Sequence, residues 1–247
     1  MSKRVYKFLK PEDGIDDLKN RRLKVSTLDG LNDPFDLFSV DTTDPNIAFA
    51  VTAMVAEFKR GMKNVPELKH GMGLTSFSRN WDNLLLWSHY ASGHTGLCLG
   101  FDISENSNKW LDVQYQPNLQ RIRGPQDLNR NFALKMFTTK HESWSYEQEV
   151  RLFVGLEDPP DDNKRFWFPF GPNLQLREVI IGVQCRTDVA DEVCKILGEW
   201  PDEIDCTWAY MRSDAFLLVR SKMTHANVFR PSERTLTLPL DTLGILG

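Results

Sequence analysis

The clearest pattern in this chain is Trp144-Ser145-Tyr146-Glu147-Gln148-Glu149-Val150-Arg151-Leu152-Phe153-Val154. With a period of two, one face of this stretch collects the apolar side chains of Trp144, Tyr146, Val150, Leu152 and Val154. The other face carries Ser145, Glu147, Glu149 and Arg151, with neighbours about 6.6–6.8 Å apart along a strand. This alternation predicts a strand over 144–154 that is buried on one side only.

The charged row on that strand has two interpretations. A cleft that stabilises positive charge needs carboxylates in fixed positions, and a carboxylate beside a reacting sugar stabilises an oxocarbenium-like transition state. Glu147 and Glu149 would then suit cleavage of an N-glycosidic or O-glycosidic bond, with one acid orienting or deprotonating the acceptor. The alternative is a solvated strand face on which Arg151 neutralises Glu149.

The composition is that of an ordinary globular protein, with 41% hydrophobic and 26% charged residues among 247. We interpret the chain as one domain, 1–247, in which residues 225–247 carry little pattern and form a C-terminal tail or extension. A formal charge of −4 and a pI near 5.8 argue against a protein that coats nucleic acid, but not against a local basic groove. Four cysteines without C-x-x-C spacing argue against a disulfide framework or zinc site.

No targeting or membrane segment is evident. The N-terminus runs from Met1 directly into a strand-like segment, and no apolar run reaches 18 residues. We therefore expect a cytoplasmic protein. Glycine-rich loops of the G-x-G-x-x-G or Walker type are absent from the sequence, so two common nucleotide-binding devices are missing.

Short strands interrupted by helices of different lengths, without a regular βαβ alternation, predict an α+β fold with small mixed or antiparallel sheets and flanking helices. The expected strands cover 5–8, 23–26, 73–78, 97–101, 113–115, 144–154, 179–182, 207–211 and 216–219. The expected helices cover 46–60, 84–90, 126–138 and 187–199. Asp82 is expected to cap the second helix, and the first two strands are expected to form one unit.

Two further pairs of side chains are candidates for a ligand site. His89 and Tyr90 end the helix expected over 84–90, where the imidazole can hydrogen bond a ribose or an amide while Tyr90 stacks beside it. The alternative is a histidine that caps helix carbonyls. Ser76 and Ser78 share one face of their strand, where their hydroxyls are placed to bind a ribose or to support a catalytic carboxylate. The alternative is that they only form the polar face of the strand.

Two other segments have candidate roles. The segment 119–140 is locally basic, which suits contact with a pyrophosphate or a nucleic-acid strand, and its alternative is a solvated helix face. Its basic residues are Arg121, Arg123, Arg130, Lys135 and Lys140. The turn at Asn32-Asp33-Pro34 is explained by local chemistry, because the Asn side chain caps the backbone and Pro34 holds Asp33 out of the helical region.

Taken together, these motifs resemble a bacterial family known as domain of unknown function 2971. The resemblance spans about residues 3–185 and rests on Tyr6-Lys7-Phe8, Val25-Ser26, Asn32-Asp33-Pro34-Phe35-Asp36, Ser76-Phe77-Ser78, Leu86-Trp87-Ser88-His89-Tyr90-Ala91, His94-x-Gly96 and Trp144-x-Tyr146-Glu147-x-Glu149-x-Arg151-Leu152. The family name implies no activity.

The order of an aromatic strand, a hydroxyl-bearing strand and a Glu-x-Glu strand is also similar to ADP-ribosyltransferases of the Arg/His–Ser–Glu plan. That resemblance implies a split β-sandwich that holds NAD between its strands. It implies that Lys7, beside Tyr6, occupies the first-strand position and that Ser76 or Ser78 occupies the second. It further implies that Glu149 is the catalytic acid.

The same resemblance implies that Glu147 orients the acceptor. The roles of the remaining candidates belong to our own hypothesis, since His89 and Tyr90 have no clear counterpart in the resemblance. Arg151 would keep Glu149 ionised, and His89 would replace the missing first-strand His. The aromatic ring that stacks on nicotinamide would belong to Trp87 or Tyr90.

We therefore expect an enzyme that uses NAD as its substrate without a metal. It would be an NAD-dependent ADP-ribosyltransferase or NAD glycohydrolase acting on a protein or nucleic-acid target, in a bacterial defence or toxin system. One alternative is a non-catalytic nucleotide-sensing or protein-interaction module of a phage-defence or stress locus. Another is a nuclease or glycosidase that uses the same carboxylates. The enzymatic interpretation requires Glu147 and Glu149 to point into a pocket that also receives the imidazole of His89.

Overall fold

The computed structural model describes residues 2–31, 33, 35–36, 38–61, 70–104, 109–156 and 161–222. The helices are α1 (Pro11–Asn20), α2 (Pro45–Arg60), α3 (Leu84–Tyr90), α4 (Arg130–Phe137) and α5 (Thr187–Gly198), with 3-10 turns η1 (Leu28–Gly30), η3 (Pro125–Asp127) and η4 (Glu142–Glu147). The strands are β1 (Ser2–Leu9), β2 (Arg22–Thr27), β3 (Met72–Ser78), β4 (Leu97–Ser104), β5 (Trp110–Asp112), β6 (Gln114–Gln116), β7 (Thr139–His141), β8 (Glu149–Gly155), β9 (Phe166–Pro169), β10 (Leu174–Ile181), β11 (Asp205–Met211) and β12 (Leu218–Lys222). The expected tail, 225–247, lies outside the described residues, as do Asn32 and Pro34 of the expected turn.

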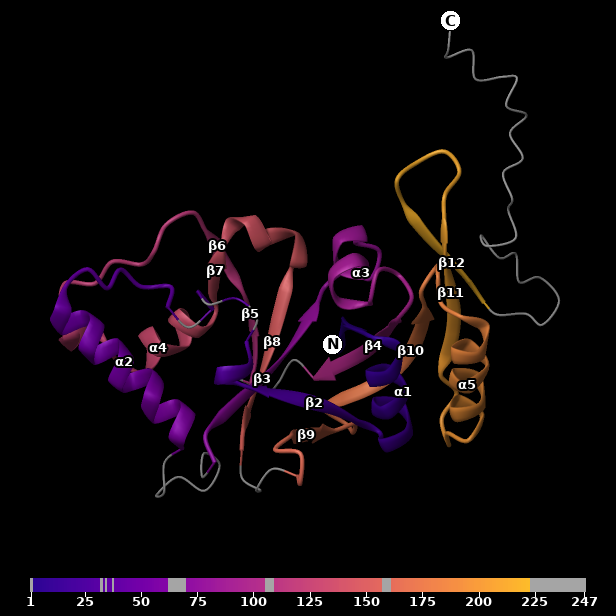
Figure 1. Cartoon of the computed structure of the whole chain (residues 1–247), viewed down its shortest axis with the longest axis horizontal. Coiled ribbons are helices and arrows are strands. Elements are labelled where there is room, and N and C mark those ends of the chain that lie inside the picture. Colours follow the sequence, from indigo (N-terminus) through magenta and orange to yellow (C-terminus); the bar gives the residue numbers. More distant parts are fainter. Residues whose placement is uncertain are drawn as a thin grey trace, which may run out of the picture.

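The main sheet has ten strands and the order β12-β11-β10-β4-β1-β3-β2-β9, while β8 pairs with β3 and β5 pairs with β8. Its pairs are antiparallel except for β10 with β11, and β6 and β7 form a separate parallel pair. The predicted α+β class is therefore confirmed. Figure 1 shows α2 and α4 at one end of the molecule and α5 at the other.

Strand β3 is the point at which the sheet divides. One edge of β3 pairs with β8 along its whole length, from Met72 opposite Gly155 to Ser78 opposite Glu149. Its other edge is shared, because the start of β3 pairs with β2 and only Ser78 at its end pairs with β1, opposite Tyr6. Strands β1 and β2 therefore diverge along this edge, and space opens between them.

The expectation that the strands at 5–8 and 23–26 form one unit is wrong. Helix α1 lies between them in the chain, and β1 pairs with β3 and β4 whereas β2 pairs with β3 and β9. Pro11 occupies the first turn of α1, where its missing N–H costs nothing, and Glu12 and Asp13 suit the positive end of the helix dipole. Helix α1 and strand β9 were both absent from the expected elements.

Both faces of the sheet are covered. Leu18 of α1 and Val193 of α5 pack with Val5 and Leu99 in one core cluster. On the opposite face, a second cluster joins α3 to β1, β4, β10 and β11 through side chains that include Tyr6, Phe8, Leu86, Trp87, Cys98, Ile180 and Ala209. A third cluster joins α2 and α4 to β3 and β8. The central strands are buried on both sides as a result.

The segment 144–154 differs from its prediction in two ways. Residues 142–147 form the 3-10 turn η4, and only 149–155 form a strand, β8, with Gln148 between them in the left-handed region at φ 43°. The polar side chains of β8 are also buried, since Glu149 is 5% and Arg151 1% exposed. The alternative of a solvated charged face is therefore wrong.

Local capping explains most of the predicted helices. The Asp44 carboxylate accepts the N–H of Asn46 at the start of α2, as expected from the Asp-Pro pair. Helix α3 is capped by Asn83 rather than Asp82, because the Asn83 side chain accepts the N–H groups of Leu85 and Leu86. The helix expected over 126–138 divides into η3 and the shorter α4.

Candidate functional site

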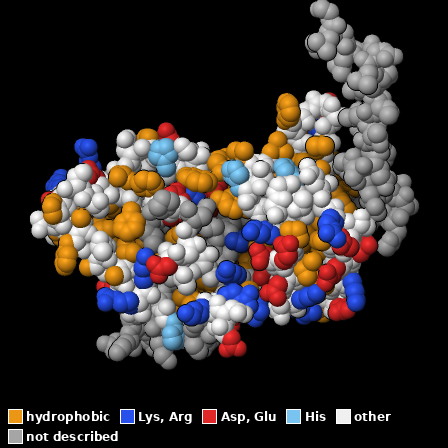
Figure 2. Space-filling model, in the orientation of Figure 1, with side chains coloured by type: hydrophobic (Ala, Val, Ile, Leu, Met, Phe, Trp, Pro, Cys, Tyr) orange, Lys and Arg blue, Asp and Glu red, His pale blue; other side chains and the backbone are white. Residues whose placement is uncertain are grey.

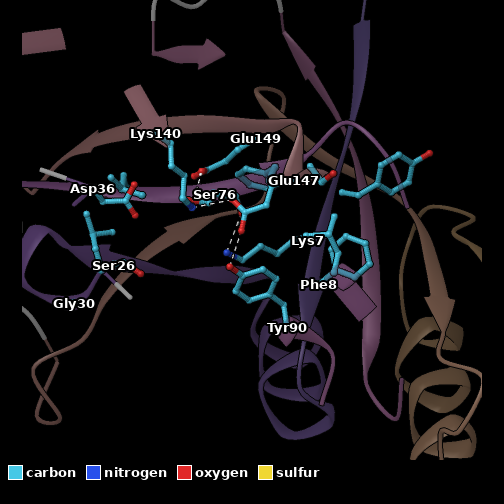
Figure 3. A pocket seen from close by; sticks show the side chains of 16 residues that line it. Lys7, Phe8, Ser26, Gly30, Asp36, Ser76, Tyr90, Lys140, Glu147 and Glu149 are labelled. Atoms are coloured by element: carbon cyan, nitrogen blue, oxygen red, sulfur yellow. Dashed lines mark hydrogen bonds and ion pairs between the residues drawn. The ribbon is translucent and has the colours of Figure 1, made fainter. Parts of the chain in front are cut away.

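A cavity of about 270 Å³ lies where β1 and β2 separate along β3. Its walls come from β1, β2, β3, α3, β7, η4, β8 and the residues around η1. The polar and aromatic side chains that line it include Tyr6, Lys7, Phe8, Ser26, Asp36, Ser76, Phe77, Ser78, Tyr90, Lys140, Glu147 and Glu149. Figure 3 shows Glu147, Glu149 and Lys140 converging on one side of the cavity and Tyr90 approaching Glu147 from the other.

Glu149 is the first residue of β8 and the most constrained carboxylate of the site. Its Oε1 atom lies 2.8 Å from Arg151 Nε and its Oε2 atom 3.1 Å from Arg151 Nη2, while the Ser76 hydroxyl also hydrogen bonds the carboxylate. Burial opposes its ionisation, but the Arg151 charge and hydrogen bonds outweigh burial and lower the pKa of Glu149 to about 2. Glu149 is therefore ionised at neutral pH.

Arg151 ties three parts of the fold together behind Glu149. Besides Glu149, it donates from Nη2 to Asp36 Oδ1 at 2.5 Å and from Nη1 to the carbonyl of Phe137 at 2.7 Å. Burial opposes its charge, but the two carboxylates raise the pKa of Arg151 above its ordinary value. The guanidinium thus fixes the turn that follows η1, the end of α4 and the start of β8 in one arrangement.

Glu147 ends η4, and the left-handed Gln148 turns the chain so that both glutamates reach Lys140. Lys140 Nζ lies 2.8 Å from Glu147 Oε2 and 3.5 Å from Glu149 Oε2, and it sits 4.5 Å from the centre of the Trp144 ring. The Tyr90 hydroxyl donates to Glu147 Oε1 at 2.7 Å. Burial raises the pKa of Glu147 despite these two partners.

The two glutamates are therefore held in different protonation regimes. A carboxylate with a depressed pKa is a permanent negative charge, whereas one with a raised pKa takes up and releases protons closer to neutral pH. The ionised group suits stabilisation of a developing cation, and the titrating group suits proton transfer to or from a ligand. This division of roles is available only because Arg151 pairs with Glu149 and not with Glu147.

Lys7 faces the same cavity from β1 under different conditions. Its ammonium donates to the carbonyl of Ser76 at 3.0 Å and lies 5.8 Å from the centre of the Phe77 ring. Among the described residues, Lys7 forms no ion pair of the kind that holds Lys140. Burial lowers the pKa of Lys7, and the charges of Asp17, Glu149 and Asp13 only partly oppose this.

Asp17 of α1 is a buried acid near Lys7, and it should make stability depend on pH. Burial raises the pKa of Asp17 from 3.8 to about 7. The native state therefore retains a proton between about pH 4 and pH 7 that the unfolded chain has lost, so the free energy of unfolding falls as pH rises through this window. In Asp17→Asn we expect this fall to be smaller by about 1–3 kcal/mol in urea titrations.

The neighbouring Asp16 provides the control for that measurement, because its side chain is 47% exposed and no buried charge is removed with it. Asp16→Asn should keep most of the pH dependence of the wild-type protein and reduce it only slightly, because burial is the main cause of the raised pKa of Asp17 and the Asp16 charge adds to it. If the free energy of unfolding of Asp17→Asn falls with pH as steeply as that of the wild-type protein, Asp17 ionises normally in the native state.

Seven of the ten predicted site residues line this one cavity: Tyr6, Lys7, Ser76, Ser78, Tyr90, Glu147 and Glu149. Arg151 lies behind it as the partner of Glu149. The Tyr6 hydroxyl also donates to Glu178 Oε1 at 3.3 Å, and burial raises the pKa of Tyr6 to about 12. The Ser78 hydroxyl accepts the N–H of Asn80.

The remaining two predicted residues lie elsewhere, and the expectation that the imidazole of His89 shares the cavity is wrong. His89 is exposed, and its Nδ1 atom lies 3.1 Å from the Tyr146 hydroxyl. Successive helix positions point about 100° apart, so Tyr90 can face the cavity only if His89 turns away. Trp87 is 0% exposed, donates from Nε1 to the carbonyl of Trp81, and is not part of the cavity wall.

The sequence interpretation missed Lys140 and Asp36 as members of the site. Lys140 belongs to the segment 119–140, for which contact with a pyrophosphate or a nucleic-acid strand and a solvated helix face were the two interpretations. Its side chain is 3% exposed and lies on β7, so it is not part of a solvated helix face. Arg121 is solvated, with a side chain that is 88% exposed and lies 3.6 Å from Asp41. On the face seen in Figure 2, acidic and basic side chains intermingle over the end that carries α1 and α5.

The fold and the cavity define an α+β protein with a buried, ion-paired glutamate site at a divided sheet. Residues 86–152 match the family described as protein of unknown function (DUF2971), which confirms the predicted resemblance over this segment. The matched segment contains Tyr90, Lys140, Glu147, Glu149 and Arg151. Searches of curated proteins and of solved structures found no match.

Two further properties concern the described residues. Among them, no helix combines the length and the apolar character that crossing a membrane requires. Their His, Cys, Asp and Glu side chains form no group of three or more that could hold a metal ion. None of the four cysteines, Cys98, Cys185, Cys194 and Cys206, forms a disulfide bond.

Proposed function

We propose that the protein binds NAD in this cavity and cleaves the bond between nicotinamide and ribose, passing ADP-ribose to a macromolecule or to water. The observation that carries the proposal is the position of Glu149, an ionised carboxylate on the cavity wall that is braced by Ser76 and Arg151. A permanent negative charge at this point would stabilise the positive charge that develops on the ribose as nicotinamide leaves.

The arrangement of strands supports the same proposal. Lys7, Ser76 and Glu149 come from β1, β3 and β8, which are neighbours in the sheet in the order β1-β3-β8. Along the chain these strands also follow the order that the Arg/His–Ser–Glu plan implies, with the strand that holds NAD first, the hydroxyl strand second and the glutamate strand last. The divergence of β1 and β2 supplies the cleft that a split sandwich provides.

The ion-paired groups beside the cavity also favour a developing cation when Glu147 is ionised. Within that cluster, Asp36, Glu147 and Glu149 carry three negative charges against two positive charges on Lys140 and Arg151, and Lys7, which lines the cavity outside the cluster, adds a positive charge when it is protonated. Glu147 would take the proton of the attacking hydroxyl as the new bond forms. Tyr90 and Lys140 would hold Glu147 in place for this transfer.

In this proposal Lys7 and Tyr6 contact the nucleotide from β1, and Tyr90 supplies the aromatic surface near nicotinamide because Trp87 is buried away from the cavity. The acceptor would be a protein or a nucleic acid, and we place the activity in the bacterial cytoplasm, in a defence or toxin system.

One observation favours a second candidate, a non-catalytic nucleotide sensor. Both glutamates already have cationic partners within the protein.

The test is to measure NAD binding and NAD cleavage in the same preparation. Thermal unfolding should show that NAD at 100 times its dissociation constant raises the free energy of unfolding by about 2.7 kcal/mol. Incubation with labelled NAD and cell lysate should release nicotinamide and transfer label. Stabilisation without release would favour the sensor, whereas the absence of both would refute NAD as the ligand.

A further inference from the structure

The cavity contains two lysines whose surroundings differ sharply. Lys140 touches both glutamates and is held as a cation by them. Lys7 donates only to the carbonyl of Ser76, and no carboxylate of the described chain pairs with it. In Figure 3 the Lys7 side chain extends from β1 toward Tyr90 and Glu147. Lys140 is therefore an electrostatic partner of the two glutamates, whereas Lys7 presents its amine to the cavity.

The groups around Lys7 determine the state of that amine. Asp13 and Asp17 on α1 and Glu149 on β8 favour the ammonium form, but removal from water has the larger effect and lowers the pKa of Lys7. Asp17 is itself buried, with a pKa of about 7, so its charge is only partly available to Lys7 at neutral pH. A lowered pKa leaves more of the lysine as the neutral amine, which is the form that acts as a nucleophile toward carbonyl carbon.

Formation of an imine needs a second group, an acid that helps the intermediate to lose water. Glu147 lines the same cavity, and burial raises its pKa so that it carries a proton more readily than an exposed glutamate. The Tyr90 hydroxyl holds Glu147 by a hydrogen bond. An amine without an ion pair and a carboxyl group with a raised pKa thus face one cavity, and imine chemistry requires a nucleophilic amine and an acid of this kind.

We propose that Lys7 forms an imine with the C1 aldehyde of a ribosyl ligand in its open-chain form. The neutral Lys7 nitrogen attacks the aldehyde carbon, and one of its protons passes to the former carbonyl oxygen to give a carbinolamine. Glu147 then supplies a proton to the departing hydroxyl, and water leaves as the C=N bond forms. The remaining nitrogen proton returns to Glu147, which gives the neutral imine. The identity of the ligand rests on the proposed function, because hydrolysis of NAD yields a ribose with a free C1. The chemistry of Lys7 itself does not depend on NAD cleavage.

The experiment uses the full chain, ribose 5-phosphate as the aldehyde, and cyanoborohydride to reduce any imine to a stable secondary amine. Peptide mass spectrometry should find Lys7 increased by the mass of the sugar less one oxygen atom. At pH 7 its modification should exceed that of the exposed Lys10 severalfold, because a lowered pKa leaves a larger fraction of Lys7 as the neutral amine and Lys7 lines the cavity. Lys10→Arg should retain the Lys7 adduct, and Lys7→Arg should lose it.

The outcomes separate this inference from the proposed function. Lys7 modified no more than Lys10 in the wild-type protein would overturn the inference, and this result needs no variant to fold. NAD cleavage without a Lys7 adduct would overturn the inference alone. A Lys7 adduct in a protein that neither binds nor cleaves NAD would refute the proposed function and leave the amine chemistry standing.

Discussion

Arg151→Met should lower the free energy of unfolding by about 3–5 kcal/mol at neutral pH, the largest effect on stability that we expect of one substitution in this chain. The substitution retains apolar volume but leaves Glu149 and Asp36, whose side chains are 5% and 3% exposed, without their shared cation. An unpaired charge in the interior costs far more than the ion pair gains, and the Phe137 carbonyl also loses its donor. Urea unfolding measures the loss.

Two comparisons distinguish this loss from a packing defect. Arg212→Met removes an exposed pair with Asp214, and we expect it to change the free energy of unfolding by less than about 1 kcal/mol. The deficit of Arg151→Met should shrink near pH 4, because unpaired buried carboxylates have raised pKa values and are protonated there. Adding Glu149→Gln should also restore part of the stability. If the loss of free energy of unfolding in Arg151→Met changes neither with pH nor on addition of Glu149→Gln, a charge-based role for Arg151 is contradicted.

The elements that the sequence predicts correctly are those with strong local signals. Asp44-Pro45 marks the start of α2, and the apolar run from Leu97 reads as a buried strand in any context. Helix α1 has a weaker local pattern: Pro11 marks its start, but it has no side-chain cap, buries only Gly14, Asp17 and Leu18, and includes a glycine in its interior. Its formation depends on packing against α5 and the sheet, which no local pattern reveals.

The segment 144–154 shows how a period-two pattern can mislead. Trp144 and Tyr146 fit the alternation of β8, yet they belong to the 3-10 turn that precedes it. The break occurs at Gln148, a residue type with no preference for the left-handed conformation that it adopts here. The chain accepts this conformation because it lets Glu147 reach Lys140 and Tyr90 while Glu149 starts the strand.

The candidate site could be predicted only in part for a related reason. Ser76 and Glu149 were found because the alternation of their strands places them on polar faces. Asp36 was missed because its partner, Arg151, lies 115 positions later in the sequence. Lys140 pairs with Glu147 and Glu149, only seven and nine positions later, and it was missed because the 3-10 turn η4 that brings these side chains together was not predicted. Sheet topology determines which distant residues form ion pairs, and no local pattern in a single sequence predicts them.

Glu149→Gln should reduce the rate of NAD cleavage by about 10²–10⁴-fold with little change in the affinity for NAD. The substitution keeps the shape and one acceptor of the side chain but removes the charge that would stabilise the developing ribosyl cation. Because Arg151 holds the pKa of Glu149 at about 2, the wild-type group stays ionised at every pH at which the assay is practicable. Nicotinamide release under saturating NAD measures the effect, and circular dichroism checks that the variant is folded.

Glu147→Gln is the matched variant, since it changes the same side chain two positions away in the same cavity. In the wild-type protein the rate of transfer should rise with pH as Glu147 loses its proton, because a general base acts only when ionised, and it should level off above the raised pKa of Glu147. Glu147→Gln should flatten that rise, whereas Glu149→Gln should preserve its shape at a lower rate. Cleavage that survives Glu149→Gln at the wild-type rate would remove Glu149 from the reaction and leave Arg151 with a purely structural partner.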